Sequence, residues 1–185
     1  MALLPYLDEK DASPEVLKIL KSRPVVLNVQ RMTANAQSIF LHRSRLSNAL
    51  FTQISIDPRL REIAILRTAK DCHSIYEWTQ HVPAAKHVGV TDEQIAAIEN
   101  WQNAKCFSEV ERLVLQFTDE VNANVKASRA TLEALKKYLS PGEIIELLII
   151  IGHWRQTASI IETTEVELEE FAGKIDILEG TTPRK

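Results

Sequence analysis

A nearly continuous apolar segment in the C-terminal part of the chain constrains the fold most strongly. Residues 144–151 read I-I-E-L-L-I-I-I, with Glu146 as the single charged residue. The preceding residues 140–143, S-P-G-E, form a capping box with proline at the first helical position, which is a strong helix start. A helix that is apolar on every side has to be surrounded by other elements, so we expect it at the centre of the domain.

The β-branched residues of this segment would also suit a buried strand, but the sequence offers no second strand candidate to pair with it. Helix starts, by contrast, recur along the chain, at Ser13-Pro14, Asp57-Pro58, 91–94, 108–111 and Ser128. Residues 25–51 contain neither proline nor glycine and indicate one or two helices, with a break around 33–35. The sequence therefore predicts an all-α fold of about six to eight helices.

Length and composition indicate a single domain over residues 1–185, with a core over about 14–170 and a polar tail over 173–185. Hydrophobic residues make up 45% of the chain and charged residues 25%, which excludes a disordered or collagen-like protein. We expect the end of the tail to fray, because nothing in its sequence would bury it.

Charge, cysteine usage and missing motifs exclude several classes of function. The formal net charge is −3 and no basic stripe with interleaved aromatic residues occurs, so we expect no nucleic-acid partner. The longest apolar run, 147–152, is far shorter than a membrane span, so we expect no membrane partner. Cys72 and Cys106, with no secretory leader ahead of them, are typical of a cytoplasmic protein. Without a phosphate loop or a zinc motif, we expect neither a cofactor nor a metal.

Two consecutive predicted helices carry the residues with the most chemical content. The helix over about 58–70 carries Glu62 in its first turn, and the helix over about 73–88 carries Glu77 and His81. Glu77 and His81 are four residues apart, so they share a helix face, and burial would couple their protonation. An ordinary ion pair on a half-exposed helix would show the same spacing.

The string Y-E-W-T-Q-H at 76–81, with L-R-E-I-A-I-L-R before it and V-P-A-A-K-H-V-G-V after it, resembles the carboxymuconolactone decarboxylase family. The wider superfamily includes the alkyl hydroperoxidase D-like proteins, whose redox branch carries Cys-x-x-Cys and then a His. Those two cysteine positions are Ser74 and Glu77 here, and Cys72 lies outside the motif. Glu62 matches the upstream Glu of the family. The chain therefore resembles the decarboxylase-like branch, which has Glu ahead of that His.

This resemblance implies a helical bundle of the alkyl hydroperoxidase D-like type that assembles as trimers or hexamers, with sites near subunit interfaces. It also implies acid/base chemistry on a small carboxylated or lactone-type molecule, by decarboxylation or a related lyase or isomerase step. His81 would donate a proton to the enolate-like product of CO₂ loss. Glu77 would orient the imidazole, and Glu62 would be a second carboxylate bonded to either.

Residues beside the motif are expected to surround the substrate. Helical projection places Ser74 and Trp78 on the stripe that carries Glu77 and His81, with Trp78 at the edge, where it could wall the pocket. Tyr76 projects to the opposite side, so its expected contribution to the pocket is packing.

Two other classes of function remain open. A redox protein would need a reactive thiolate near His81, and Cys72 is the candidate. A non-catalytic oligomer or binding protein would keep the Glu/His pair as a buried polar brace. Separately, His42, Arg43 and Arg45 could face an anionic substrate, although long cations on a helix are usually solvated.

Overall fold

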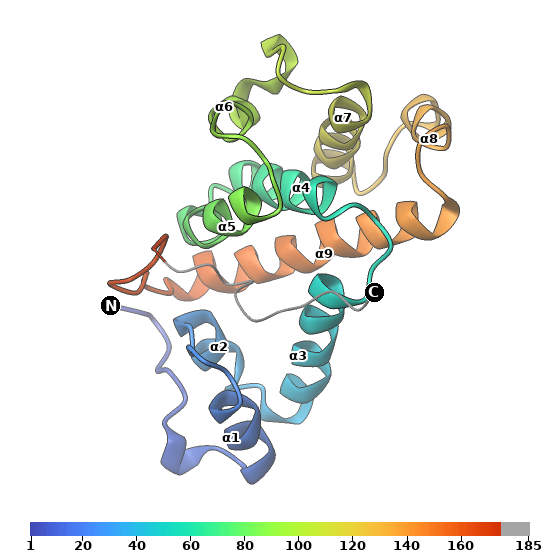
Figure 1. Ribbon diagram of the computed structural model, residues 1–185. Helices are drawn as coiled ribbons and strands as arrows, with labels where there is room; N and C mark the ends of the chain where they lie inside the picture. Colours follow the sequence, from blue (N-terminus) through green and yellow to red (C-terminus); the bar gives the residue numbers. More distant parts are fainter. Residues whose placement is uncertain (175–185) are drawn as a thin grey trace.

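The computed structural model describes residues 1–174, and within them the chain forms helices and loops without a strand (Figure 1). The α-helices are α1 (Pro14–Lys21), α2 (Asn28–Thr33), α3 (Gln37–Thr52), α4 (Pro58–Asp71), α5 (Ile75–His87), α6 (Asp92–Ala97), α7 (Glu109–Asn124), α8 (Arg129–Leu135) and α9 (Pro141–Thr164), and the 3-10 helices are η1 (Glu9–Asp11) and η2 (Ile98–Asn103). The expected all-α fold is confirmed. Of the predicted polar tail, residues 175–185 lie outside the described residues.

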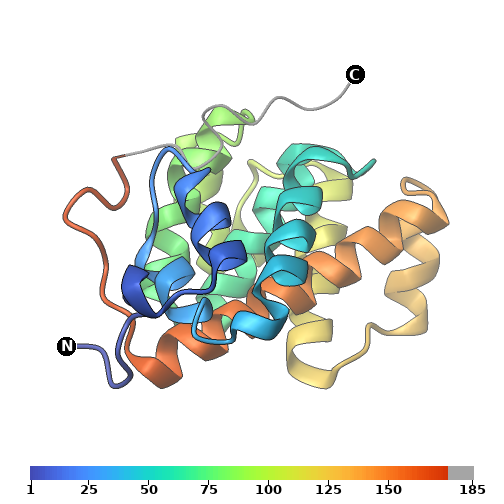
Figure 2. The ribbon, with the colours of Figure 1, turned by 90° about the horizontal axis from the view of Figure 1, so that it is seen from below.

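The described residues contain nine α-helices, slightly more than the six to eight predicted, and residues 25–51 form two helices, which is the larger of the two numbers expected for this segment. Helix α2 ends with Ala34 as its C-cap, and Ala36 leaves the helical conformation with φ −84° and ψ 60°. The break lies where it was predicted, around 33–35. It lets α2 and α3 take different directions (Figure 2).

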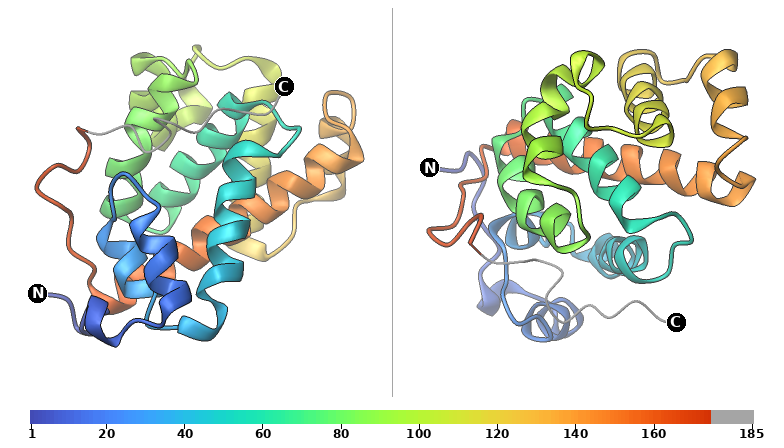
Figure 3. Two further views of the ribbon diagram at one scale, coloured as in Figure 1. Left: turned by 60° about the horizontal axis from the view of Figure 1, so that its bottom comes forward. Right: turned by 45° about the horizontal axis from the view of Figure 1, so that its top comes forward.

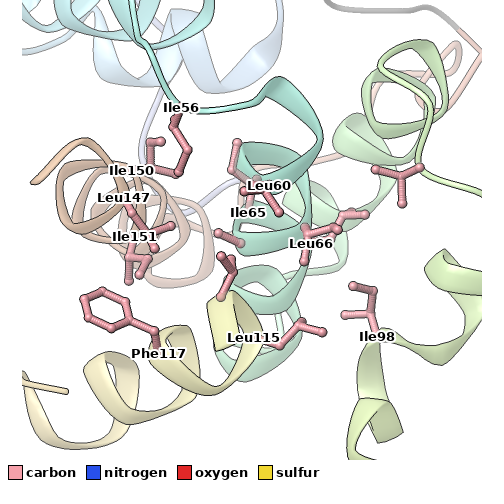
Figure 4. Close-up of a cluster of buried hydrophobic side chains, with 14 of the residues drawn as sticks. Ile56, Leu60, Ile65, Leu66, Ile98, Leu115, Phe117, Leu147, Ile150 and Ile151 are labelled. Carbon is pink, nitrogen blue, oxygen red and sulfur yellow. The ribbon is translucent and has the colours of Figure 1, made fainter. Parts of the chain in front are cut away.

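Helix α9 is the central element, as predicted. It runs through the middle of the domain, with α4 and α5 on one side and α2 and α3 on the other (Figures 1 and 3). Leu147, Ile150 and Ile151 are buried on α9 and belong to the main hydrophobic core, together with side chains of α4 and α7 (Figure 4). Ser140 and Glu143 form the predicted capping box at the start of this helix.

By length and composition alone, α9 could also cross a membrane, and no other helix of residues 1–174 could. Half of the most apolar 18-residue stretch of this helix is buried inside the domain. A central helix of a globular domain passes the same test, because it too must be apolar on several sides. The helix therefore gives no independent argument for a membrane partner.

Helix α4 carries charged residues into the interior. It contacts α5, α7 and α9, and Arg61 and Glu62 on it are both buried. Its start is anchored to the central helix, because the Glu146 carboxylate accepts hydrogen bonds from the backbone N–H groups of Ser55 and Ile56, at 2.9 and 2.8 Å. Buried charges are rare unless they are paired, so the surroundings of Arg61 and Glu62 indicate where chemistry can occur.

Adjacent isoleucines on α9 provide a matched test of this packing. Ile150 is 0% exposed and Ile149 is 43% exposed. We expect Ile150→Ala to lower the free energy of unfolding by about 2–5 kcal/mol, because it opens a cavity between α4, α7 and α9. Within a single chain, Ile149→Ala should change it by about 0.5 kcal/mol or less, so both variants are compared at a protein concentration where the chain is monomeric. Urea unfolding of both variants measures the difference, and equal losses would contradict the central position of α9.

Candidate active site

Local sequence signals place the two acid/base helices. Asp57 caps α4, where its side chain accepts a hydrogen bond from the N–H of Arg59 at 2.7 Å. Ser74 caps α5, and its hydroxyl accepts a hydrogen bond from the N–H of Glu77 at 3.5 Å. Between the helices, His73 has a φ of 54°, which turns the chain sharply. The turn is short, so α4 and α5 pack side by side and can bring their polar side chains together.

Glu62, Glu77 and His81 lie in one buried cluster, as the sequence predicts. The closest contact joins His81 Nδ1 to Glu62 Oε2 at 2.9 Å. The other oxygen of Glu62 accepts a hydrogen bond from Arg61 Nε at 2.8 Å, so this carboxylate is paired on both sides. Burial alone would raise the pKa of Glu62, but His81 and Arg61 together hold it below its ordinary value. Glu62 is therefore a fixed negative charge behind the imidazole.

Trp154 of α9 completes the surroundings of His81. The Trp154 Nε1–H group donates a hydrogen bond to His81 Nε2 at 2.7 Å. An indole N–H can only donate, so His81 Nε2 is an acceptor in this arrangement and the ring proton is on Nδ1, pointing to Glu62. Phe51 stacks on the imidazole at a centroid distance of 6.1 Å and restricts its rotation. The ring of His81 is thus held in one orientation and one tautomer.

Glu77 differs from Glu62 because it has much less compensation for burial. Its Oε2 atom is 3.5 Å from His81 Nε2, a longer contact than the one between Glu62 and Nδ1. Burial raises the pKa of Glu77 to about 7, although His81 and Arg43 act in the opposite direction. The two carboxyl groups therefore have different roles. Glu62 stays ionised, whereas Glu77 can exchange a proton near neutral pH.

A cavity of about 150 Å³ lies between α2, α3, α5 and α9, next to this cluster. Glu77, His81 and Trp154 line one part of it, whereas the buried Glu62 does not. Side chains of α3 and α9 that line another part are Arg43, Ser47, His153 and Thr157. The acid/base groups thus face a space that can hold a small molecule.

The predicted pocket residues are placed differently from one another. Tyr76 lines the cavity, and its hydroxyl donates a hydrogen bond to Glu169 at 2.6 Å. Ser74 and Trp78 are not among the lining residues. Ser74 is used as a helix cap, and Trp78 packs against the main core under the ammonium of Lys70, at 4.3 Å from the ring centroid. The cavity is therefore reached by Glu77 and His81 of the predicted stripe together with Tyr76, whereas Trp78 faces the core.

Several residues of the site carry no local signal in the sequence. No motif or spacing in the sequence marks Trp154, Arg61 or Arg23 as part of a site. Arg23 simply follows the end of α1. Arg43 is a candidate for an anionic substrate from the sequence and does line the cavity. Contacts such as that of Trp154 with His81, which are 73 residues apart, depend on how the helices pack.

Metal binding has no visible support at this cluster. Both ring nitrogens of His81 already have hydrogen-bond partners, Glu62 and Trp154. Across residues 1–174, no group of three or more His, Cys, Asp or Glu side chains is arranged to hold a metal ion.

Comparison with known families supports the resemblance seen in the sequence. Residues 39–120 match the model of the carboxymuconolactone decarboxylase family. This segment contains Glu62, Glu77 and His81, and it confirms the predicted family resemblance. None of the curated proteins matches the chain.

Solved structures establish the type of fold. An uncharacterized peroxidase-related protein from Ralstonia eutropha JMP134, described as an alkylhydroperoxidase AhpD core, has 15% sequence identity and a TM-score of 0.80, with 99% of this chain and 98% of that chain covered. A variant of the debrominase Bmp8 in complex with 2,3,4-tribromopyrrole has 16% identity and a TM-score of 0.77, with 97% of both chains covered. A protein of unknown function from Agrobacterium tumefaciens has 22% identity and a TM-score of 0.68, over 74% of this chain and 94% of that chain. The fold is of the alkyl hydroperoxidase D-like type.

The raised pKa of Glu77 makes a prediction about stability. The folded pKa of about 7 lies above the ordinary value of 4.5, so the folded state holds this proton more tightly than the unfolded state. The stabilisation is complete below pH 4.5 and is lost as the pH rises through 7. Relative to Glu77→Gln, which stays neutral, the natural protein should lose up to about 3 kcal/mol of unfolding free energy between pH 4.5 and 8.

Urea unfolding of both proteins across this pH range checks the prediction. Glu133→Gln is the control, because its carboxylate is 54% exposed and pairs with Lys136 at the surface. If the unfolding free energies of the Glu77→Gln variant and of the natural protein changed with pH in parallel, Glu77 would be ionised over the whole pH range and the prediction would be wrong.

Proposed function

From the premise that residues 39–120 belong to the carboxymuconolactone decarboxylase family, we propose that this protein is an enzyme of acid/base chemistry. Its substrate is a small carboxylated or lactone-type molecule bound in the cavity beside α5. The reaction is a decarboxylation or a related lyase or isomerase step, without an organic cofactor. Small-molecule acid/base chemistry needs a group that exchanges a proton near pH 7 and faces the substrate.

The observation that carries this proposal is the pairing of Glu77 with His81 at the cavity wall. Glu77 has a pKa of about 7 and lies 3.5 Å from His81 Nε2. Glu62, paired with Arg61, lies behind the imidazole and fixes its orientation through the contact with Nδ1. The arrangement supplies a carboxyl group that exchanges its proton, an oriented imidazole and a fixed negative charge within one buried network.

The geometry revises the division of roles expected from the sequence. His81 Nε2 accepts the Trp154 N–H, so His81 carries no proton there to donate to a substrate. We therefore assign the exchanged proton to Glu77. Loss of CO₂ would leave an enolate-like carbanion, to which the protonated form of Glu77 gives its proton, and the Glu77 carboxylate left behind is protonated again from solvent water near neutral pH. The neutral imidazole of His81 positions Glu77 during this step. Glu62, rather than Glu77, orients the imidazole.

A thiol-based redox function has less support from the site. The cysteine positions of the redox branch are held by Ser74 and Glu77, and Cys72 and Cys106 are free thiols. Burial raises the pKa of the Cys72 thiol, which lowers the fraction of reactive thiolate at neutral pH.

Self-association and a cytoplasmic location belong to the same proposal. Two isoleucines of α9 that do not contribute to the core, Ile145 and Ile149, are 54% and 43% exposed. Exposed apolar side chains on one helix suit a contact with a second copy of the chain. We propose a homo-oligomer, a trimer or hexamer by family resemblance.

Turnover of the Glu77→Gln and His81→Gln variants tests the acid/base assignment. With carboxymuconolactone or a related small lactone acid as substrate, we expect both variants to lose at least about 100-fold in the rate of CO₂ release, because Glu77→Gln lacks the exchanged proton and His81→Gln lacks the imidazole that positions Glu77. Trp154→Phe should lose less, because it keeps the aromatic wall and removes one hydrogen bond.

Thermal unfolding of the same variants separates catalysis from a structural brace. A brace would show a loss of about 1.5–3 kcal/mol in stability for His81→Gln with no activity to lose. If His81→Gln or Glu77→Gln kept full specific activity, the catalytic assignment of that residue would be wrong.

Peroxide assays test the redox alternative. We expect no thiol-dependent reduction of hydroperoxides, because neither Ser74 nor Glu77 can form the sulfenate and disulfide that such a cycle needs. Consumption of cumene hydroperoxide with dithiothreitol as reductant is the measurement. Activity that disappears in Cys72→Ser would refute this expectation, with Cys106→Ser as the matched control.

A further inference from the structure

Two arginines of the cavity have donors without a partner. Arg23 follows α1, Arg43 is on α3, and both line the cavity. The Nε atom of each is buried and has no hydrogen-bond partner among residues 1–174. No carboxylate of the described chain forms an ion pair with either guanidinium. A buried guanidinium donor without an acceptor is costly, so these two positions are built to receive an acceptor from outside.

The side chains around Arg43 form an ordered polar ladder between α3 and α9. Arg43 Nη2 donates a hydrogen bond to Thr157 Oγ1 at 2.8 Å. One turn along both helices, Ser47 Oγ is 2.7 Å from His153 Nε2. We call these four side chains, Arg43, Ser47, His153 and Thr157, the recognition ladder. The Arg43–Thr157 bond uses one terminal nitrogen and fixes the guanidinium, while its Nε remains unpaired.

The charge balance of the cavity also favours an anion. Burial lowers the pKa of His153 to about 4, and the charges of Arg43 and His81 act in the same direction, so this imidazole is neutral. The acidic group that lines the cavity with Arg23 and Arg43 is Glu77, which exchanges its proton near neutral pH. Two guanidinium charges thus face at most one carboxylate, and the cavity has a net positive charge.

We propose that Arg23 and Arg43 bind a carboxylate of a ring-sized organic acid and hold its remaining part toward Glu77 and His81. Guanidinium groups bind carboxylates with directed, charge-assisted hydrogen bonds. A cavity of about 150 Å³ is large enough to hold a benzene ring, so a ring-sized acid fits. This proposal rests on the proposed function in one respect only, namely that the end of the molecule near Glu77 and His81 is the end that reacts.

This subsite lies partly outside the segment that the family match covers, because only Arg43 and Ser47 of its residues are within 39–120. Arg23 precedes the matched residues 39–120, and His153 and Thr157 follow them. The acid/base residues lie inside the match. Recognition of the anion therefore depends on Arg23 and on α9 as well as on the matched segment.

Calorimetric titration with benzoate and with its neutral isostere benzamide tests the proposal without turnover. We expect the natural protein to bind benzoate at least about tenfold more tightly than benzamide. Arg23→Met and Arg43→Met should each weaken benzoate roughly tenfold to a hundredfold and leave benzamide unchanged. Arg45→Met is the matched control, because Arg45 is exposed on the same helix as Arg43.

Each outcome decides the matter. Equal binding of benzoate and benzamide, or no binding of benzoate, overturns the proposal. Unchanged benzoate affinity in both arginine variants overturns it as well. If Arg43→Met fails to fold, Arg43→Lys and the comparison of the two ligands on the natural protein give the answer. Failure of CO₂ release alone, with benzoate binding intact, would refute the proposed reaction and leave the anion site standing.

Discussion

The buried carboxylate of Glu62 is the constraint on which the rest of the site depends. It is 0% exposed, so its charge must be compensated inside the protein. Arg61 from the same helix and His81 from the next helix provide this compensation, at 2.8 and 2.9 Å. Removing one partner of such a network leaves an uncompensated charge and costs roughly 3–5 kcal/mol. The network therefore fixes the register of α4 against α5.

That register determines what His81 can do. With Nδ1 held by Glu62, the imidazole presents Nε2 to the cavity, where Trp154 and Glu77 lie. Glu77 is as deeply buried as Glu62 but lacks an arginine at hydrogen-bonding distance, and its pKa rises to about 7. Two similar carboxyl groups 15 residues apart in the sequence thus acquire opposite properties from their neighbours.

The cavity combines two halves with different origins. The acid/base half comes from α4 and α5, within the segment that matches the family. The cationic half comes from Arg23 and the recognition ladder, which belong to the end of α1, to α3 and to α9. Helix α9 lies between the two groups of helices (Figure 1) and contributes side chains to both halves. The central helix that organises the core therefore also organises the site.

The sequence by itself determined the helices and part of the site. Capping residues and apolar spacing act over one turn, so the starts of α4, α7 and α9 and the break before α3 could be predicted. The shared face of Glu77 and His81 follows from helix geometry, and family resemblance added Glu62. Which side of α5 is covered by α3 and α9 is not a local property, and for that reason Tyr76 and Trp78 exchanged their expected places.

Only the tertiary structure decided the remaining partners. Trp154, Arg23 and Arg43 reach the cavity from helices far apart in the sequence, and no spacing rule links them to His81. The same holds for the protonation of Glu77, because burial and neighbouring charges, rather than residue type, set the pKa of a carboxyl group. Local signals thus specify the elements, whereas the low dielectric and the contacts of the packed interior specify their chemistry.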